Sequence, residues 1–256
     1  MNGNPKQGPL VDLVIPTLNE AHVLERSVER VRAYLADSFP YPARVICADN
    51  GSKDGTGDIA DALAARHSNV KAHRLDVRGR GRALREAWSA SDADIVAYTD
   101  VDLSTELPAL EKLCRAIHED GYDLATGSRL MADSRVTRGF KREIISRSYN
   151  LMIKSLFFTR FSDAQCGFKA VSRRVVRDVL PQVRDNSWFF DTELLILAEK
   201  QGYRIKDVPV LWIDDDDSRV KIFKTAVDDV KGLLRVRRHL WSRGYRAARR
   251  ASVPTT

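Results

Sequence analysis

The sequence has no long apolar segment. Among its 256 residues, no run approaches the ~20 apolar residues that a membrane-spanning helix needs. The polar start, MNGNPKQGP, also lacks the apolar stretch of a signal peptide. We therefore expect a cytoplasmic protein in which residues 1–9 form a disordered N-terminus. The length suits one large α/β domain, alone or with an appended tail.

Cysteine is scarce. The three cysteines, Cys47, Cys114 and Cys166, show no CxxC spacing, which argues against a disulfide framework. Cys47 and Cys114 lie in apolar strand-like or helix-like patterns, so we expect them to be small buried residues.

Acidic residues are absent from the C-terminal segment. From Lys231 onward there are eight Lys or Arg residues and no Asp or Glu, whereas the preceding 230 residues carry 34 basic and 35 acidic side chains. A nucleic-acid-binding body carries its own basic face, so we expect no nucleic-acid partner. A basic segment with interleaved apolar residues suits an anionic membrane surface. A solvated basic helix that only packs against the body is an equally good interpretation.

Apolar runs alternate with segments of helical periodicity up to residue 127. The pattern predicts strands at 10–16, 44–48, 70–75, 94–99 and 122–127, and helices at 20–36, 55–66, 81–91 and 106–119. This alternation is typical of a mostly parallel, right-handed wound sheet flanked by helices.

The alternation stops after Arg129. Residues 133–143 are polar and basic, and we expect a mobile loop there. The next segment, 144–161, is amphipathic and helix-like. Further elements are predicted as a strand at 167–172, a helix at 190–201, a strand at 204–213 and a final helix from about 222.

Two acidic clusters each follow a strand-like run. The cluster DNGSKDGT occupies 49–56, and DVD occupies 100–102. Carboxylates at the carboxyl ends of parallel strands face one crevice of an open α/β sheet, where ligands bind. Asp100 and Asp102 lie on the same side of an extended chain, so they can jointly hold a divalent cation that clamps a nucleotide diphosphate. The pattern predicts a nucleotide-sugar transferase.

These acidic residues also have structural alternatives. Capping of the helix at 106–119 is better served by Ser104 or Thr105 than by the DVD pair. In the first cluster, Asp54 is expected to act as a turn or helix cap. For Asp49 we favour a ligand contact, because a carboxylate at a strand end can accept hydrogen bonds from a base or ribose.

Seven sequence blocks occur in the order seen in family-2 glycosyltransferases. They are VIPTLNEAHVL at 14–24, ADNGSKDGT at 48–56, RGRGRALREA at 78–87, DVDL at 100–103, TGSR at 126–129, DAQCGFKA at 163–170 and WFFDTELL at 188–195. The chain resembles the polyprenyl-phosphate (dolichyl-phosphate) hexose synthases, and WFFDTELL is closer to the glucosyl-phosphate than to the mannosyl-phosphate synthases. The resemblance implies a GT-A fold for residues 10–225, followed by a basic C-terminal helix and tail at 226–256.

The resemblance also implies a reaction. It is an inverting transfer of a hexose or N-acetylhexosamine from a nucleoside-diphosphate sugar to polyprenyl phosphate, with Mg²⁺ or Mn²⁺ as cofactor. A UDP-sugar is favoured, and the enzyme is expected to sit peripherally on the inner face of the cell membrane. By resemblance, Asp102 is the direct metal ligand, and Asp100 contacts ribose or a metal-bound water. The expected nucleotide-sugar site comprises Pro16, Thr17, Asn19, Glu20, Asp49, Asn50, Ser52, Arg80, Asp100, Val101, Asp102, Arg219 and Lys221.

The acceptor determines what catalysis requires. A phosphate monoester has a second pKa near 6, so at neutral pH it is largely a dianion and already nucleophilic. It needs cations to approach the anionic donor. By resemblance to the mannosyl-phosphate synthases, the acceptor phosphate is bound by Arg129, Arg142, Ser146 and Arg147, and we add Lys169; Arg138 and Lys141 are expected to be solvated charges.

Two carboxylates are assigned to the reaction centre. By resemblance, Asp163 is a catalytic or orienting carboxylate, and Asp191 contacts a donor-sugar hydroxyl. Glu193 has a structural alternative, because acidic residues favour the first turn of a helix. The segment DDDDSRVK at 214–221 departs from the Ser-Lys pair usual in the family. Its aspartates are an additional cation site or a solvated loop.

Alternative functions stay open at this point. The donor can be GDP-mannose, and the acceptor can be soluble or a polysaccharide. A neutral hydroxyl acceptor needs a base rather than a cluster of cations, which disfavours the second alternative. A nucleotide-binding adaptor is disfavoured by the intact DVD and Asp163.

Overall fold

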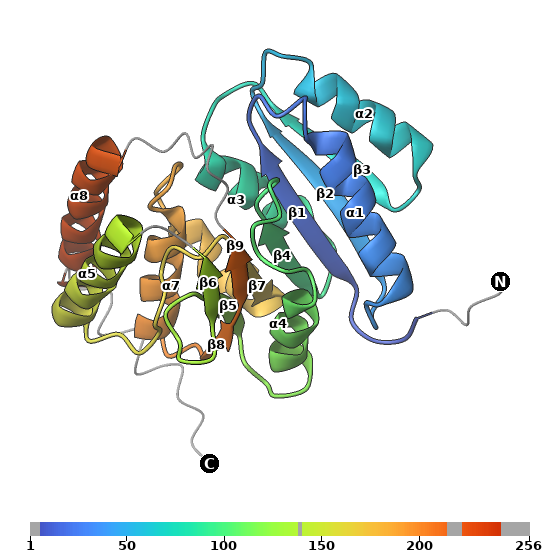
Figure 1. Ribbon diagram of the computed structural model, residues 1–256. Helices are drawn as coiled ribbons and strands as arrows, with labels where there is room; N and C mark the ends of the chain where they lie inside the picture. Colours follow the sequence, from blue (N-terminus) through green and yellow to red (C-terminus); the bar gives the residue numbers. More distant parts are fainter. Residues whose placement is uncertain (1–5, 138–139, 214–221, 242–256) are drawn as a thin grey trace.

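The computed structural model describes residues 6–137, 140–213 and 222–241. Its centre is a seven-stranded sheet with the strand order β3-β2-β1-β4-β7-β5-β8 (Figure 1). The strands are β1 (Val11–Thr17), β2 (Ala43–Asn50), β3 (Val70–Leu75), β4 (Ile95–Thr99), β5 (Leu124–Ser128), β7 (Phe168–Ser172) and β8 (Ile205–Pro209). All neighbouring strands are parallel except β7, which is antiparallel to β4 and β5. The predicted mostly parallel α/β sheet is confirmed.

Helices cover both faces of this sheet. One face carries α1 (Leu24–Asp37), α2 (Thr56–Arg66) and α4 (Ala109–His118); the other carries α3 (Arg80–Ala90), α5 (Phe140–Phe157), α6 (Arg173–Asp178), α7 (Phe190–Lys200) and α8 (Ile222–Trp241). Each face has its own buried apolar cluster, because strands that are covered on both sides direct alternate side chains into both layers. All three cysteines are buried and free, as expected for Cys47 and Cys114.

The antiparallel strand β7 begins beside the carboxyl end of β4. Its first residue, Phe168, pairs with Thr99, the last residue of β4. The turn before β7 therefore lies beside the carboxyl end of β4. At Gly167 an added Cβ would lie 1.8 Å from a carboxylate oxygen of Asp100, so only glycine allows the turn to approach this carboxylate so closely.

A second, two-stranded sheet lies outside the main one. It pairs β6 (Arg135–Thr137) with β9 (Leu211–Ile213) in parallel. The predicted loop at 133–143 is therefore wrong, because it contains β6 and the start of α5. The single strand predicted at 204–213 divides into β8 and β9. These short strands are stabilised by pairing between distant segments, which a local sequence pattern cannot show.

Two local predictions also need correction. Helix α4 begins at Ala109 without a side-chain cap, so neither Ser104 nor Thr105 caps it. Thr105 instead bridges to Trp212 of β9. Helix α6 and the short 3-10 helix at Leu180–Gln182 were not predicted.

Both ends of the described chain pack against the body. Lys6, from the segment expected to be disordered, donates to the carbonyl oxygens of Ala36 and Phe39 at 3.0 and 2.6 Å. Helix α8 buries Leu233 and Val236 in the same apolar cluster as α7. The final helix therefore contributes to the core as well as carrying basic charge.

Candidate active site

The loops after β1 and β2 are hydrogen-bonded to each other. Asn19 adopts a left-handed conformation with φ 56°, which asparagine tolerates better than most residues. Its backbone N–H donates to Oγ of Ser52 at 2.9 Å, and its side-chain oxygen accepts from the N–H of Lys53 at 2.9 Å. Asn19 and Ser52, both predicted nucleotide contacts, thus fix the shape of this edge. Asp54 accepts from the N–H groups of Ala21 and Thr56, as its expected role of turn cap requires.

Polar groups line the ends of these two strands. Thr17 pairs in register with Asp49, so the two side chains lie side by side on one face of the sheet. Both are buried, and among the described residues the Thr17 hydroxyl has no hydrogen-bond partner. A buried hydroxyl without a partner is costly unless a ligand or water satisfies it. Asn50 accepts from the N–H of Gly79, which ties β2 to the start of α3.

Arg80 connects two carboxylates of the site. At the first position of α3, its guanidinium donates to Asp100 at 2.7 Å and to Asp191 at 2.8 Å. The same group lies 4.9 Å from the ring centroid of Tyr98 and 5.2 Å from that of Trp188. These carboxylates and rings hold Arg80 in one place, and they hold its pKa well above the ordinary value despite burial.

Asp191 lies in the first turn of α7 and is buried. Its carboxylate accepts from the Tyr98 hydroxyl at 2.6 Å and lies 3.3 Å from the ammonium of Lys169. Burial raises the pKa of Asp191, but Lys169 and Arg80 outweigh it and leave the pKa below its ordinary value. Lys169 itself is fully buried. It was predicted to bind acceptor phosphate, but the structure places it beneath Asp191 as that residue's counterion.

Asp163 is clamped by Arg129. Two guanidinium bonds of 2.8 and 3.1 Å and a backbone bond of 3.1 Å run from Arg129 to its carboxylate, and the N–H of Gln165 adds another at 3.1 Å. Asp163 is fully buried, which raises its pKa, yet Arg129 lowers it to about 2. Asp163 is therefore ionised at neutral pH and accepts protons poorly. Arg129 was predicted to bind acceptor phosphate, and in this structure it is bound to Asp163.

The strand-terminal pair Asp100 and Asp102 lies at the open end of β4. Asp100 is held by Arg80 on one oxygen, and 42% of its side chain is exposed. Asp102 is exposed, accepts from the N–H of Ser104 at 3.0 Å, and borders a hollow with Arg26, Ser27, Arg30 and Leu103. No group of three or more His, Cys, Asp or Glu side chains that could hold a metal occurs within the described residues. Asp100 and Asp102 would supply two carboxylate ligands to a cation, and its remaining ligands would be substrate phosphate oxygens and water, as is usual for Mg²⁺.

The residues of α5 that were predicted to bind the acceptor lie in different environments. Ser146 is buried, and its hydroxyl lacks a hydrogen-bond partner among the described residues. Arg147 instead is 61% exposed and pairs with Glu143 along the helix surface. The side chain of Arg142, and all of Arg138, Arg219, Lys221 and the aspartates at 214–217, lie outside the described residues.

Several residues of the site were missed by sequence reasoning. Asn150 of α5 accepts from the N–H of Ala164 at 2.9 Å and so fixes α5 against the turn that carries Asp163. Tyr98 was also missed, although strand alternation places it on the same side as Asp100. Glu193 is a structural residue, since it accepts from two backbone N–H groups at 184–185 and from Arg235.

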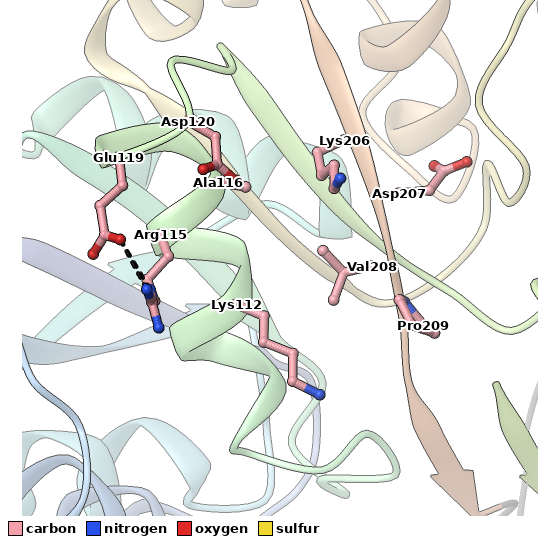
Figure 2. A pocket seen from close by; sticks show the side chains of 9 residues that line it. All are labelled: Lys112, Arg115, Ala116, Glu119, Asp120, Lys206, Asp207, Val208 and Pro209. Carbon is pink, nitrogen blue, oxygen red and sulfur yellow. Dashed lines mark hydrogen bonds and ion pairs between the residues drawn. The ribbon is translucent and has the colours of Figure 1, made fainter. Parts of the chain in front are cut away.

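A second hollow lies away from this site. Figure 2 shows it between α4 and β8, lined by Lys112, Arg115, Ala116, Glu119, Asp120, Lys206, Asp207, Val208 and Pro209. None of the residues assigned to donor, metal or acceptor lines it. The candidate active site is therefore the sheet edge formed by the ends of β1, β2 and β4 and the start of β7.

Comparison with known proteins identifies the family. The model of "Glycosyl transferase family 2" matches residues 12–180. The chain belongs to this family. The matched region runs from β1 to the start of the short 3-10 helix after α6, and it includes Asp49, Asp100, Asp102 and Asp163.

Curated glycosyltransferases of this kind match along most of the chain. Glycosyltransferase AglD of Haloferax volcanii is 38% identical over 89% of this chain, which spans only 37% of that protein's length. The dolichyl-phosphate beta-glucosyltransferases of Dictyostelium discoideum and Homo sapiens are each 26% identical, over 92% and 89% of this chain and 76% and 74% of theirs.

Solved structures share the fold. Glucosyl-3-phosphoglycerate synthase of Mycobacterium tuberculosis, in complex with Mn²⁺, UDP and glucosyl-3-phosphoglycerate, has a TM-score of 0.68 at 20% identity, covering 90% of this chain and 80% of that one. This likeness shows a GT-A type glycosyltransferase fold, as predicted. The chain is a glycosyltransferase.

Proposed function

We propose that this glycosyltransferase moves a hexose, with inversion, from a UDP-sugar to polyprenyl phosphate. The observation that carries the proposal is the clamp of Arg129 on Asp163. A carboxylate with a pKa of about 2 is a poor general base at neutral pH. An acceptor that arrives as an anion needs no base, and a phosphate monoester is such an acceptor.

The reaction follows from the placement of charged groups. An oxygen of the acceptor phosphate attacks the anomeric carbon, the bond from that carbon to the diphosphate oxygen breaks, and its electron pair leaves with UDP. Attack on the face opposite the leaving group inverts the anomeric centre. Asp100 and Asp102 would hold the divalent cation, which when bound offsets the charge on the diphosphate. Asp191, held by Arg80 and Lys169, would orient sugar hydroxyls, and Asp163 would orient Arg129 toward the acceptor.

The names of the relatives support UDP-glucose as the donor. Two of the curated relatives bear the name dolichyl-phosphate beta-glucosyltransferase, and the mycobacterial fold relative is also known in complex with Mn²⁺ and UDP-glucose. A mannosyl-3-phosphoglycerate synthase shares the fold with a TM-score of 0.61 at 17% identity. GDP-mannose therefore stays as the second candidate donor.

A lipid-extraction assay tests this function. We expect label from UDP-glucose to enter the organic phase only when polyprenyl phosphate and Mg²⁺ or Mn²⁺ are present, and not when polyprenol replaces its phosphate. Faster transfer from GDP-mannose would reassign the donor. Label recovered only in a water-soluble product would reassign the acceptor.

The proposed acceptor requires access to a membrane, and α5 and α8 offer a surface for it. The two helices contact each other and lie at one end of the molecule, opposite α1 and α2 (Figure 1). We define the helix-pair surface by its exposed apolar side chains, which are Ile144, Ile145 and Leu151 of α5, Phe158 directly after α5, and Val227, Val230, Leu234 and Trp241 of α8. Exposed cations flank them, including Lys231 and Arg238. Within the described residues, no helix is both long enough and apolar enough to cross a bilayer. The exposed apolar side chains and cations of the helix-pair surface support a further part of the proposal, peripheral binding to the inner face of the cell membrane.

The double variant Leu151→Glu/Leu234→Glu tests the helix-pair surface. It should weaken binding to anionic vesicles by about tenfold or more, because it replaces two exposed apolar side chains with anions. Transfer to a short, water-soluble phosphate acceptor should change little. Ala33→Glu/Ala62→Glu, on exposed positions of α1 and α2, adds the same two anions and is the matched control. Equal vesicle binding by both variants, measured by sedimentation over a salt series, would exclude this surface. A truncation after Val230 is unsuitable, because it removes the buried Leu233 and Val236.

A further inference from the structure

Trp188 is an exposed aromatic residue beside the buried charges of the site. Three aromatic residues precede or begin α7, and two of them, Phe189 and Phe190, are 2% and 0% exposed. Trp188, the third, is 48% exposed. A tryptophan carries one of the largest apolar surfaces of any side chain, so leaving half of it in water forgoes stabilisation that the adjacent residues obtain.

The backbone on both sides of Trp188 is fixed. Before it, the N–H of Ser187 donates to Asp185 at 2.7 Å, and the carbonyl of Asn186 accepts from the N–H of Arg82 at 3.2 Å. After it, Phe189 and Phe190 are anchored in the apolar cluster. The indole is thus presented from a rigid segment, which lowers the entropy lost when a ligand packs on it.

The ring is also held through the site's central cation. The guanidinium of Arg80 lies 5.2 Å from the Trp188 ring centroid, within the range of a cation–π contact. That same guanidinium is bound to Asp100 and Asp191. Trp188 therefore lies one side chain away from both the metal carboxylate and the carboxylate assigned to donor-sugar hydroxyls.

We propose that Trp188 is the platform on which the donor's hexose ring packs and that it helps to select the sugar. A pyranose has polar edges and an apolar C–H face, so its recognition needs hydrogen-bonding groups together with a flat apolar surface. Asp191 would supply a hydrogen-bonding group, and the indole of Trp188 would supply the flat apolar surface. The base is expected at the other end of the edge, near Thr17 and Asp49. Glucose and its C4 epimer, galactose, carry different C–H bonds on each ring face, so packing of one face on the indole should discriminate between them.

The proposal rests on the proposed donor, so the experiment measures binding as well as transfer. The full chain and its variants Trp188→Ala, Trp188→Phe and Trp241→Ala would be titrated with UDP, UDP-glucose, UDP-galactose and GDP-mannose. Trp241→Ala is the matched control for donor binding alone, since Trp241 is also an exposed tryptophan with an Arg, Arg237, 5.0 Å from its ring, but it belongs to the helix-pair surface. Steady-state transfer would give the apparent KM for donor and for acceptor.

The expected result has three parts. Trp188→Ala should raise the donor KM by roughly fivefold to tenfold, as loss of one aromatic contact predicts, and leave the acceptor KM within about twofold. Its discrimination between UDP-glucose and UDP-galactose should fall. Trp188→Phe should keep most of the affinity, because it keeps a flat ring.

Each other outcome has a definite meaning. Equal loss of affinity for UDP and UDP-glucose would place the base on Trp188 and overturn the proposal. Donor affinities equal to those of Trp241→Ala would also overturn it. If Trp188→Ala does not fold, Trp188→Leu, which removes only the flat ring, takes its place. Absence of transfer from UDP-glucose by the wild type would contradict the proposed function. The role of Trp188 would still be decided by comparing how much Trp188→Ala weakens the binding of UDP-glucose with how much it weakens the binding of UDP.

Discussion

Asp102→Asn is expected to lower sugar transfer by about a hundredfold or more. The substitution keeps the size of the side chain and its ability to accept from the N–H of Ser104, but it removes the negative charge that would bind the divalent cation. Asp102 is exposed, so we expect the melting temperature to change by less than a few degrees. Initial rates at several Mg²⁺ and Mn²⁺ concentrations, together with thermal unfolding, measure both effects.

Asp58→Asn is the control for Asp102. Asp58 is also an exposed carboxylate, with 80% of its side chain accessible, but it lies on α2 and pairs with Arg74. It should transfer sugar at the wild-type rate. Near-normal transfer by folded Asp102→Asn, or by the wild-type protein in excess chelator, would remove the metal from the mechanism.

Asp163→Asn is expected to have the largest combined effect on stability and activity. It leaves the buried guanidinium of Arg129 without its anion, which typically costs about 3–5 kcal/mol of unfolding free energy. Transfer should fall by about a hundredfold or more, because Arg129 is no longer held beside the reaction centre. Urea unfolding and initial rates measure the two losses.

The stability effect has a defined pH dependence. The pKa of Asp163 is about 2 in the folded protein, against an ordinary value of 3.8. A lowered pKa stabilises the fold above about pH 4, and this contribution, about 2 kcal/mol, disappears as the pH falls toward 2. The difference in stability between wild type and Asp163→Asn should therefore shrink over that interval.

Asp207→Asn is the control, at a partly buried carboxylate that has no arginine clamp. Asp207 accepts from the N–H of Ser162 at 2.7 Å, and burial raises its pKa. An asparagine can keep this bond without a buried charge, so we expect a small effect on stability. Similar losses in both variants would mean that the Arg129 clamp contributes nothing specific.

The sequence predicted the first half of the sheet closely because its signals are local. The strand predicted at 70–75 coincides with β3, and those at 44–48 and 94–99 differ from β2 and β4 by a few residues. Each is a short apolar run bounded by polar turns, and that pattern depends only on neighbouring residues. Asp49, Asp100 and Asp102 could be predicted as site residues for the same reason, since they lie at or just after the ends of such strands.

The partners of those acids were harder to predict. Arg129 and Lys169 are cations in two of the family blocks, and the sequence could not distinguish contact with phosphate from contact with an adjacent carboxylate. Asn150 lies on an amphipathic helix where any polar residue is expected to face water, yet it holds the turn at Ala164. Such pairings depend on how distant elements pack, and helical periodicity does not encode that.

The buried ion pairs imply an order for product release. Arg80, Lys169 and Arg129 are matched by Asp100, Asp191 and Asp163, so this inner layer adds little net charge to whatever binds above it. Under the proposed reaction, the acceptor changes from a phosphate dianion to a phosphodiester monoanion, while the nucleotide gains the charge that the acceptor loses. The electrostatic attraction between the site's cations and the lipid product therefore weakens as the product forms. The attraction between the nucleotide and the divalent cation strengthens at the same step. The charge arrangement favours early departure of the sugar-lipid and late departure of the nucleotide.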